Sequence, residues 1–185
     1  MAKTRQVKNT TPKKKGITNS VNPAGTSNTL SYDFSYSNWL KCINNKEFTN
    51  RLKDESQFSM SFFEIFQTIL PTVQKNWDTI KLNQKKQFPH CHTVPPSKIE
   101  MVEKITKEIH GRPLLDEEDN SLKYWQLGMT QSIRVIAVYN QLKNVFFPVF
   151  VDYHHLIHDS VKYNQNDYDQ YNFCPVCRYS KSIVY

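Results

Sequence analysis

Three runs of apolar and β-branched residues in the second half of the chain have the composition of β-strands. They are "LKYWQLGM" from residue 122, "SIRVIAVYN" from residue 132 and "NVFFPVFVD" from residue 144. Only the short polar connections "TQ" and "QLK" separate them, so they predict consecutive antiparallel strands. Pro148 lies inside the third run. Because proline cannot donate a ladder hydrogen bond, it predicts an edge strand or a bulge.

Helical spacing of apolar residues is found in the first half of the chain. Residues 39–52 and 61–70 both have it, and Pro71 is positioned to stop or kink the second helix. If the pattern continues through Trp77, the two parts form one long bent helix. Ahead of these segments, "LSYDFSYS" (30–37) alternates apolar and polar residues with the period of a half-buried strand.

The helix with the clearest boundaries is predicted for residues 97–110. Ser97 and Glu100 form the S-x-x-E pattern of a capping box, and Gly111 is the residue type that most often follows a helix. The apolar positions of one face are Ile99, Val102, Ile105 and Ile109. Together these elements predict an α+β fold, in which N-terminal helices pack on one side of a three- to four-stranded antiparallel sheet.

The positive charge of the chain is concentrated near its N-terminus. The formal net charge is +7, from 24 Lys and Arg against 17 Asp and Glu, and residues 1–30 hold six of these cations and no acid. With few apolar residues, this segment predicts a disordered basic arm, followed by a single domain over residues 31–185. Subtracting six from 24 leaves 18 cations against 17 acids in that domain. Any basic surface of this domain that binds nucleic acid must therefore be confined to a small part of it.

No apolar run approaches the roughly 18 residues that span a bilayer, and the N-terminus has no signal-peptide core. The chain is therefore expected to be cytoplasmic and to have no membrane partner. In that compartment the four cysteines are expected to be thiols or metal ligands rather than disulfides. They are Cys42, Cys91, Cys174 and Cys177.

The sequence "CPVC" predicts half of a structural zinc site. Cys174 and Cys177 have the spacing that brings two thiolates to one metal ion, which then needs two more Cys or His ligands. His90 and His92 of "HCH" are candidates for these two positions. The alternative ligands are His154, His155 and His158.

The order of elements and the three strand motifs resemble the RelE/ParE-type toxins. The motifs are "YWQLG", "IRVIAVYN" and "VFFPVFVDYHH", within residues 122–158. The resemblance implies an endoribonuclease that cleaves mRNA by acid–base chemistry without a catalytic cofactor, with RNA or the ribosome and an antitoxin protein as partners. By matching position, it implies that Arg134 clamps the phosphate and that His154 or His155 transfers a proton. Tyr153 is a further catalytic candidate by the same likeness.

The residues themselves leave alternatives open. His and Arg suffice for metal-free RNA cleavage, but adjacent strand residues face opposite ways, so at most one of His154 and His155 can point into a given site. Arg134 lies within an apolar strand and needs either a phosphate or a carboxylate, such as that of Asp152, as its partner. The alternative function is a non-catalytic, zinc-stabilised protein of a mobile element that binds protein or nucleic acid. A third is a metal nuclease, because "DYHHLIH" ahead of "CPVC" resembles the HNH type.

Overall fold

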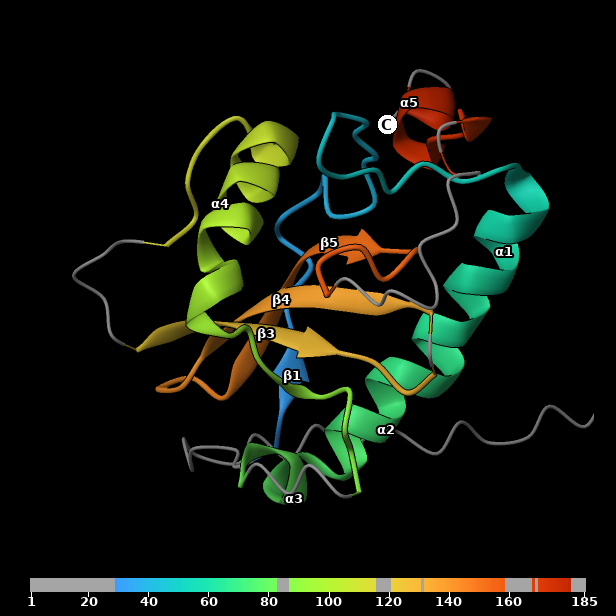
Figure 1. The fold of residues 1–185 in the computed structure, drawn as a ribbon. Helices are drawn as coiled ribbons and strands as arrows, with labels where there is room; N and C mark the ends of the chain where they lie inside the picture. Colours follow the sequence, from blue (N-terminus) through green and yellow to red (C-terminus); the bar gives the residue numbers. More distant parts are fainter. Residues whose placement is uncertain are drawn as a thin grey trace, which may run out of the picture.

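The computed structural model of the chain describes residues 29–82, 87–115, 121–130, 132–158, 168 and 170–180. Its centre is a five-stranded sheet in the order β1-β5-β4-β3-β2 (Figure 1). The strands are β1 Ser31–Tyr32, β2 His92–Thr93, β3 Leu122–Leu127, β4 Arg134–Asn140 and β5 Val145–Asp152. The helices are α1 Glu55–Glu64, the π-helix η1 Ile65–Ile69, α2 Leu70–Lys75, α3 Trp77–Lys81, α4 Pro96–His110 and α5 Pro175–Tyr179. The predicted α+β class is confirmed, while residues 1–28 of the predicted arm lie outside the described residues.

β3, β4 and β5 form the antiparallel meander that the sequence predicts. Ala137 of β4 lies opposite Pro148 of β5. Its neighbour Ile136 lies opposite Phe150, so Val149 is the extra residue of a β-bulge. The bulge predicted at Pro148 is therefore confirmed. Two further strands of two residues each extend the sheet: β1 pairs parallel with the start of β5, and β2 pairs antiparallel with β3.

Helical structure continues from α1 through η1 and α2 to α3, as the pattern beyond Pro71 predicts. The N–H of Leu70 donates to the carbonyl of Ile65, five residues earlier, which is the bond of a π-turn. Proline has no N–H, and its ring displaces the carbonyl four residues earlier, so the ordinary helical ladder cannot include Pro71. The wider π-turn lies directly before the proline and makes room for its ring.

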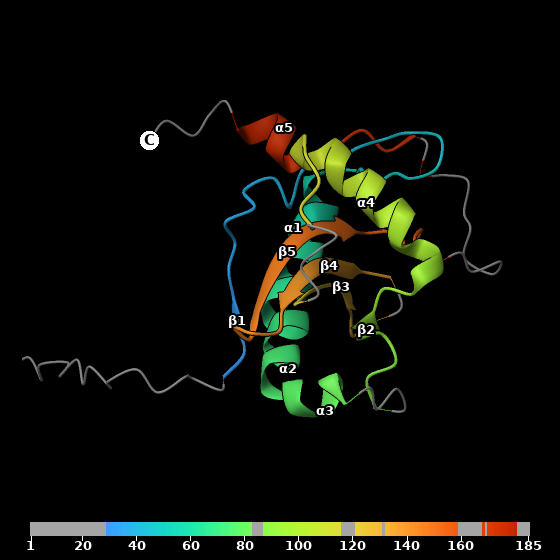
Figure 2. The same cartoon turned by 90° about the vertical axis from the view of Figure 1, so that its left-hand side faces the viewer.

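Helices cover both faces of the sheet, so the prediction that they lie on one side is wrong. Val135 and Ala137 of β4 pack in the core with η1, α2 and α3, whereas Ile136 and Val138 pack in a second core with α4. Figures 1 and 2 show α4 and the α1–α2 segment on opposite sides of the sheet. The sequence contains the reason, because the apolar run of β4 is continuous, as is typical of a strand buried on both faces.

The predicted helix over residues 97–110 is α4, with two differences at its start. The N-cap is Pro95, and no side chain caps the first turn. Ser97 lies inside that turn, so the predicted capping box does not form. At the other end, Gly111 adopts a φ of 74° and ends the helix as predicted. His110 donates from Nε2 to the carbonyl of Val149 (2.8 Å), which ties α4 to the bulge in β5.

Residues 39–52 form a loop, so the helix predicted there is wrong. Asn50 is fully buried, and its side chain forms hydrogen bonds with backbone groups of the loop and of β5. Its Oδ1 accepts from the N–H of Ile43 (2.8 Å), and its Nδ2 donates to the carbonyl of Val151 (3.0 Å). The loop is thereby fastened to the end of β5. Within the ranges described here, no helix is both long and apolar enough to span a bilayer.

Candidate functional site

Arg134 is the most deeply buried of the candidate catalytic residues, with 1% of its surface exposed. Its Nη1 donates to the carbonyls of Thr130 (2.6 Å) and Ile133 (2.8 Å), and its Nη2 donates to Nδ1 of His90 (3.0 Å). Desolvation by burial lowers the pKa of the guanidinium. Gly128 leaves the necessary space, since a Cβ there would lie 2.8 Å from Cδ of Arg134. This arginine stabilises the β3–β4 connection and offers almost no surface to an incoming phosphate.

Asp152 lies opposite Arg134 in the strand register and is fully buried. Its carboxylate accepts the backbone N–H groups of His154, Leu156 and Ile157, at 3.2, 3.1 and 3.0 Å. Burial raises the pKa of this carboxyl group, and the three hydrogen bonds act in the opposite direction. Asp152 therefore fixes the turn that follows β5, where the candidate histidines lie.

His154 and His155 lie in different surroundings. The Nε2 of His154 donates to the carbonyl of Arg51 (2.6 Å), and the ring stacks on Tyr168 with centroids 4.1 Å apart. Only 6% of its surface is exposed. His155 is half-buried and adopts a left-handed φ of 59°. Tyr153, the last of the catalytic candidates, is buried, and its hydroxyl has no hydrogen-bond partner among the residues that the structure describes.

Four of the six histidines form a cluster, which we call the histidine cluster: His90, His92, His155 and His158. The ring centroid of His158 lies 5.5 Å from that of His92 and 6.1 Å from that of His155. Burial, followed by the neighbouring imidazoles of His92 and His155, lowers the pKa of His158 to about 4. Burial also lowers the pKa of His90 and of His155. The lowered pKa values keep these three imidazoles unprotonated at neutral pH.

The two cysteines of "CPVC" lie with a third cysteine that the sequence did not suggest. We call Cys42, Cys174 and Cys177 the thiol cluster. The Sγ of Cys174 accepts the backbone N–H groups of Cys42 (3.2 Å) and Cys177 (3.3 Å). Each of these cysteines is a free thiol.

The four candidate zinc ligands therefore lie in two places. His90 and His92 belong to the histidine cluster, whereas Cys174 and Cys177 belong to the thiol cluster. Among the described residues, no group of three or more His, Cys, Asp or Glu side chains is arranged to hold a metal ion. Zinc binding by this chain stays a prediction.

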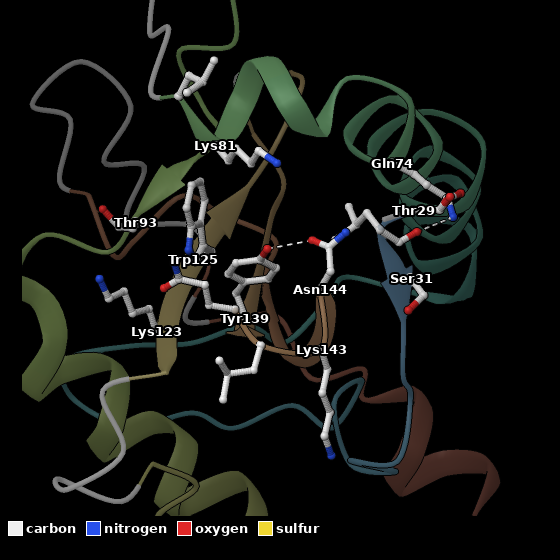
Figure 3. A pocket seen from close by; sticks show the side chains of 14 residues that line it. Thr29, Ser31, Gln74, Lys81, Thr93, Lys123, Trp125, Tyr139, Lys143 and Asn144 are labelled. Carbon is white, nitrogen blue, oxygen red and sulfur yellow. Dashed lines mark hydrogen bonds between the residues drawn. The ribbon is translucent and has the colours of Figure 1, made fainter. Parts of the chain in front are cut away.

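A pocket of about 1250 Å³ lies on the α2–α3 side of the sheet, and we call it the lysine pocket. Fourteen residues line it (Figure 3). Its charged residues are Lys81, Lys123 and Lys143, and no acidic side chain belongs to the lining as far as the described residues go. The other lining residues are Thr29, Leu30, Ser31, Gln74, Leu82, Thr93, Trp125, Tyr139, Gln141, Leu142 and Asn144.

The wall of the lysine pocket is aromatic. Figure 3 shows Trp125 and Tyr139 next to one another in the middle of the view. The hydroxyl of Tyr139 donates to Oδ1 of Asn144 (2.7 Å), and the indole N–H of Trp77 donates to the same oxygen (2.9 Å). The indole N–H of Trp125 has no hydrogen-bond partner among the described residues, and the protein covers this atom. The wall therefore offers a ligand its aromatic surface rather than this donor.

The sequence contains one signal for this pocket, which our interpretation of it missed. Lys123 and Trp125 are two residues apart on β3 and therefore lie on the same face of the sheet. The rest of the lining comes from β1, β2, α2, α3, β4 and the connection between β4 and β5, which only the fold brings together.

Residues 35–181 match the family described as "Uncharacterised protein UU032". The chain is also 33% identical over 175 residues to "Uncharacterized protein UU032" of Ureaplasma parvum serovar 3 (strain ATCC 700970), covering 94% of each chain. The protein therefore belongs to this family. No solved structure matches the chain.

This membership overturns the resemblance to RelE/ParE-type toxins, which is wrong. The motifs that suggested it are short apolar strands, and any buried antiparallel meander needs similar residues. The functional expectations derived from that likeness do not follow from the family.

Proposed function

We propose that the protein binds single-stranded nucleic acid in the lysine pocket. The observation that supports this most is the composition of the lining, which combines three lysines with the aromatic side chains of Trp125 and Tyr139 and has no acidic side chain among the described residues. The lysines would contact the phosphate groups of a bound strand, and the aromatic wall would contact its bases. Proteins that bind single strands combine aromatic side chains with a cationic groove in the same way.

The charge of the pocket supports a polyanionic ligand. Within the part of the chain that the structure describes, its lining has three lysines and no acid, although residues 31–185 as a whole are nearly neutral. Such local excess is what a phosphate backbone requires. Lys81 contributes less than the other two, because its Nζ pairs with Asp78 at 2.7 Å. Lys123 and Lys143 are exposed and carry most of the proposed phosphate contact.

The size of the pocket supports a strand over a single small molecule. Its volume of about 1250 Å³ is above the range of roughly 300–1,000 Å³ that drug-sized ligands occupy. Amide and hydroxyl groups from Gln74, Gln141 and Thr93 lie around the aromatic wall and suit the edges of bases. A short segment of several nucleotides fits these properties better than a free mononucleotide.

The test is fluorescence anisotropy with a labelled single-stranded RNA of about 12 nucleotides, with DNA of the same sequence and a mononucleotide competitor as further arms. The double variant Lys123→Glu, Lys143→Glu should lose affinity on the order of ten-fold or more, because two phosphate contacts become repulsive. Two copies of the same charge change at exposed sites outside the lining, Lys46→Glu with Lys53→Glu, form the matched control.

A second variant tests the aromatic wall. Trp125→Phe replaces the indole with a smaller ring and should weaken binding by roughly five-fold, because less aromatic surface is left for contact with a base, a contact worth about 1–3 kcal/mol. Equal affinity for wild type, both double variants and Trp125→Phe would contradict the proposal. Stronger binding of the mononucleotide than of either strand would contradict the choice of ligand.

Cleavage of RNA is a second proposal, and the half-buried His155 beside other neutral imidazoles supports it. A neutral imidazole can take the proton of a 2′-hydroxyl in metal-free cleavage. The RNA used for the anisotropy assay is incubated with wild type and with His155→Ala, and its fragments are separated by length. Intact RNA with both proteins would contradict this proposal.

A further inference from the structure

The thiol cluster joins two segments that lie far apart in the sequence. Leu52 and Phe173 form an isolated antiparallel bridge, with N–H to carbonyl bonds of 2.9 Å in both directions. This bridge holds the loop that carries Cys42 against the segment that leads to α5. Cys174 is the N-cap of α5, and Cys177 lies in its first turn.

Cys174 is the hub of the cluster because every hydrogen bond within it ends on its sulfur. The Sγ accepts the backbone N–H groups of Cys42 and Cys177, whereas the Sγ of Cys42 donates to the carbonyl of Leu40 (3.8 Å). Two N–H donors on one sulfur stabilise its negative charge, so Cys174 is the member of the cluster that most readily holds a thiolate.

The two members of "CPVC" differ in exposure. Cys174 has 6% of its surface exposed, while Cys177 is exposed to solvent. A molecule from solution therefore meets the sulfur of Cys177 first. The buried sulfur of Cys174 lies behind it and accepts the backbone N–H of Cys177 (3.3 Å).

We propose that Cys174 and Cys177 form a redox-active dithiol that undergoes exchange with the disulfides of small thiols. In the first step, the Cys174 thiolate takes the proton of Cys177, and the resulting Cys177 thiolate attacks the small disulfide, whose S–S bond breaks. Cys177 then carries a mixed disulfide, and the small thiolate that leaves takes the proton back from Cys174, which becomes a thiolate again. In the second step, the thiolate of Cys174 attacks the sulfur of Cys177 and expels the second small thiol as its thiolate. The protein loses two electrons in forming the Cys174–Cys177 disulfide, and the small disulfide gains them.

The test treats the full chain with glutathione disulfide at pH 7 and follows it by intact mass and peptide mapping. Wild type should lose two hydrogens, carry no lasting glutathione, and give a linked Cys174–Cys177 peptide. Cys174→Ser should retain one glutathione on Cys177, because the resolving thiolate is absent. Cys177→Ser should gain neither product within the time in which wild type is converted.

Cys91→Ser is the matched control, since Cys91 is buried outside the cluster and donates to the carbonyl of Gly128 (3.3 Å), a bond that serine can replace. This variant should react like wild type. Two outcomes would overturn the proposal. One is a disulfide that joins Cys42 to Cys174 in place of Cys177. The other is purified chain with about one zinc per molecule whose thiols react only after chelation, because the cluster would then be a metal site.

Discussion

The turn after β5 determines which candidate catalytic side chain can meet a substrate. Asp152 accepts three backbone N–H groups from this turn and so fixes its course. As a result, His154 faces the carbonyl of Arg51, and His155 faces His158. Of the four residues that the sequence suggested for catalysis, only His155 retains substantial exposure.

His158 should make the protein sensitive to acid. Its pKa is about 4 in the fold, against 6.5 for an ordinary histidine, because it is buried beside His92 and His155. Between these two values the unfolded chain binds a proton that the folded chain does not, so stability falls as pH falls. The groups that face His158 are His92, His155, Lys98 and Asp152, and only Asp152 favours its protonation.

The measurement is urea denaturation at pH 7 and at pH 5. Wild type should lose more free energy of unfolding between the two pH values than His158→Gln, which has no group that titrates at this position. A loss of equal size in the two proteins would show that the histidine is not the source of the pH dependence.

At the level of elements, the β3–β4 connection depends on a close approach between Gly128 and Arg134. A Cβ on residue 128 would lie 2.8 Å from Cδ of Arg134 and 3.0 Å from the carbonyl oxygen of Ile133. Because the second contact is with backbone, the strain cannot be relieved by rotating one side chain. Gly128→Ala should therefore lower the free energy of unfolding by about 1–3 kcal/mol.

Gly111→Ala is the comparison for this prediction. Residue 111 has a φ of 74° and no atom within 4 Å of an added Cβ. The substitution should therefore lower the free energy of unfolding only through backbone strain, by about 1–2 kcal/mol. The two variants are distinguished by their structural effect: Gly128→Ala should speed hydrogen exchange in β3 and β4, and Gly111→Ala should not. If Gly128→Ala is as stable as wild type, the close packing around Arg134 is not a constraint.

The helices and strands that the sequence predicted correctly are those whose apolar residues, as spaced along the chain, are also the residues buried in the fold. Three strands and α4 have periodic or continuous apolar residues, so their existence follows from composition. β1 and β2 have two residues each, too few to carry a period. Residues 39–52 have helical spacing, but Asn50 bonds the backbone of the loop and β5 instead. Here tertiary contacts outweigh the local pattern.

At the level of the whole molecule, the candidate sites are less predictable from the sequence than the helices and strands, because each site combines residues from distant segments. The "CPVC" spacing indicated Cys174 and Cys177, but Cys42 joins them only through the bridge between Leu52 and Phe173. In the same way, the lysine pocket takes its cations from α3, β3 and the β4–β5 connection. Net charge could not reveal this pocket, since the cations near it are balanced by acids elsewhere in the chain.

The lysine pocket and the basic segment that precedes the described residues could each bind nucleic acid, and deleting the segment distinguishes their contributions. Residues 1–28 contain six cations and no acid, so they should add electrostatic affinity for any nucleic acid. Deletion of residues 1–28 should leave the melting temperature nearly unchanged, because few of these residues are apolar. It should also weaken binding and reduce its dependence on salt. The slope of log K against log salt concentration should become less steep by about 0.7 for each phosphate that the deleted cations would neutralise.

Within the shortened chain, the pocket should still determine what binding remains. Lys123→Glu with Lys143→Glu should reduce affinity by the same factor with or without residues 1–28, since charge effects at separate sites add. If the shortened chain binds RNA equally well with and without the two substitutions, the basic segment is the binding element and the pocket is not. A shortened chain that is insoluble, or whose melting temperature falls by several degrees, would show instead that residues 1–28 contribute to the fold.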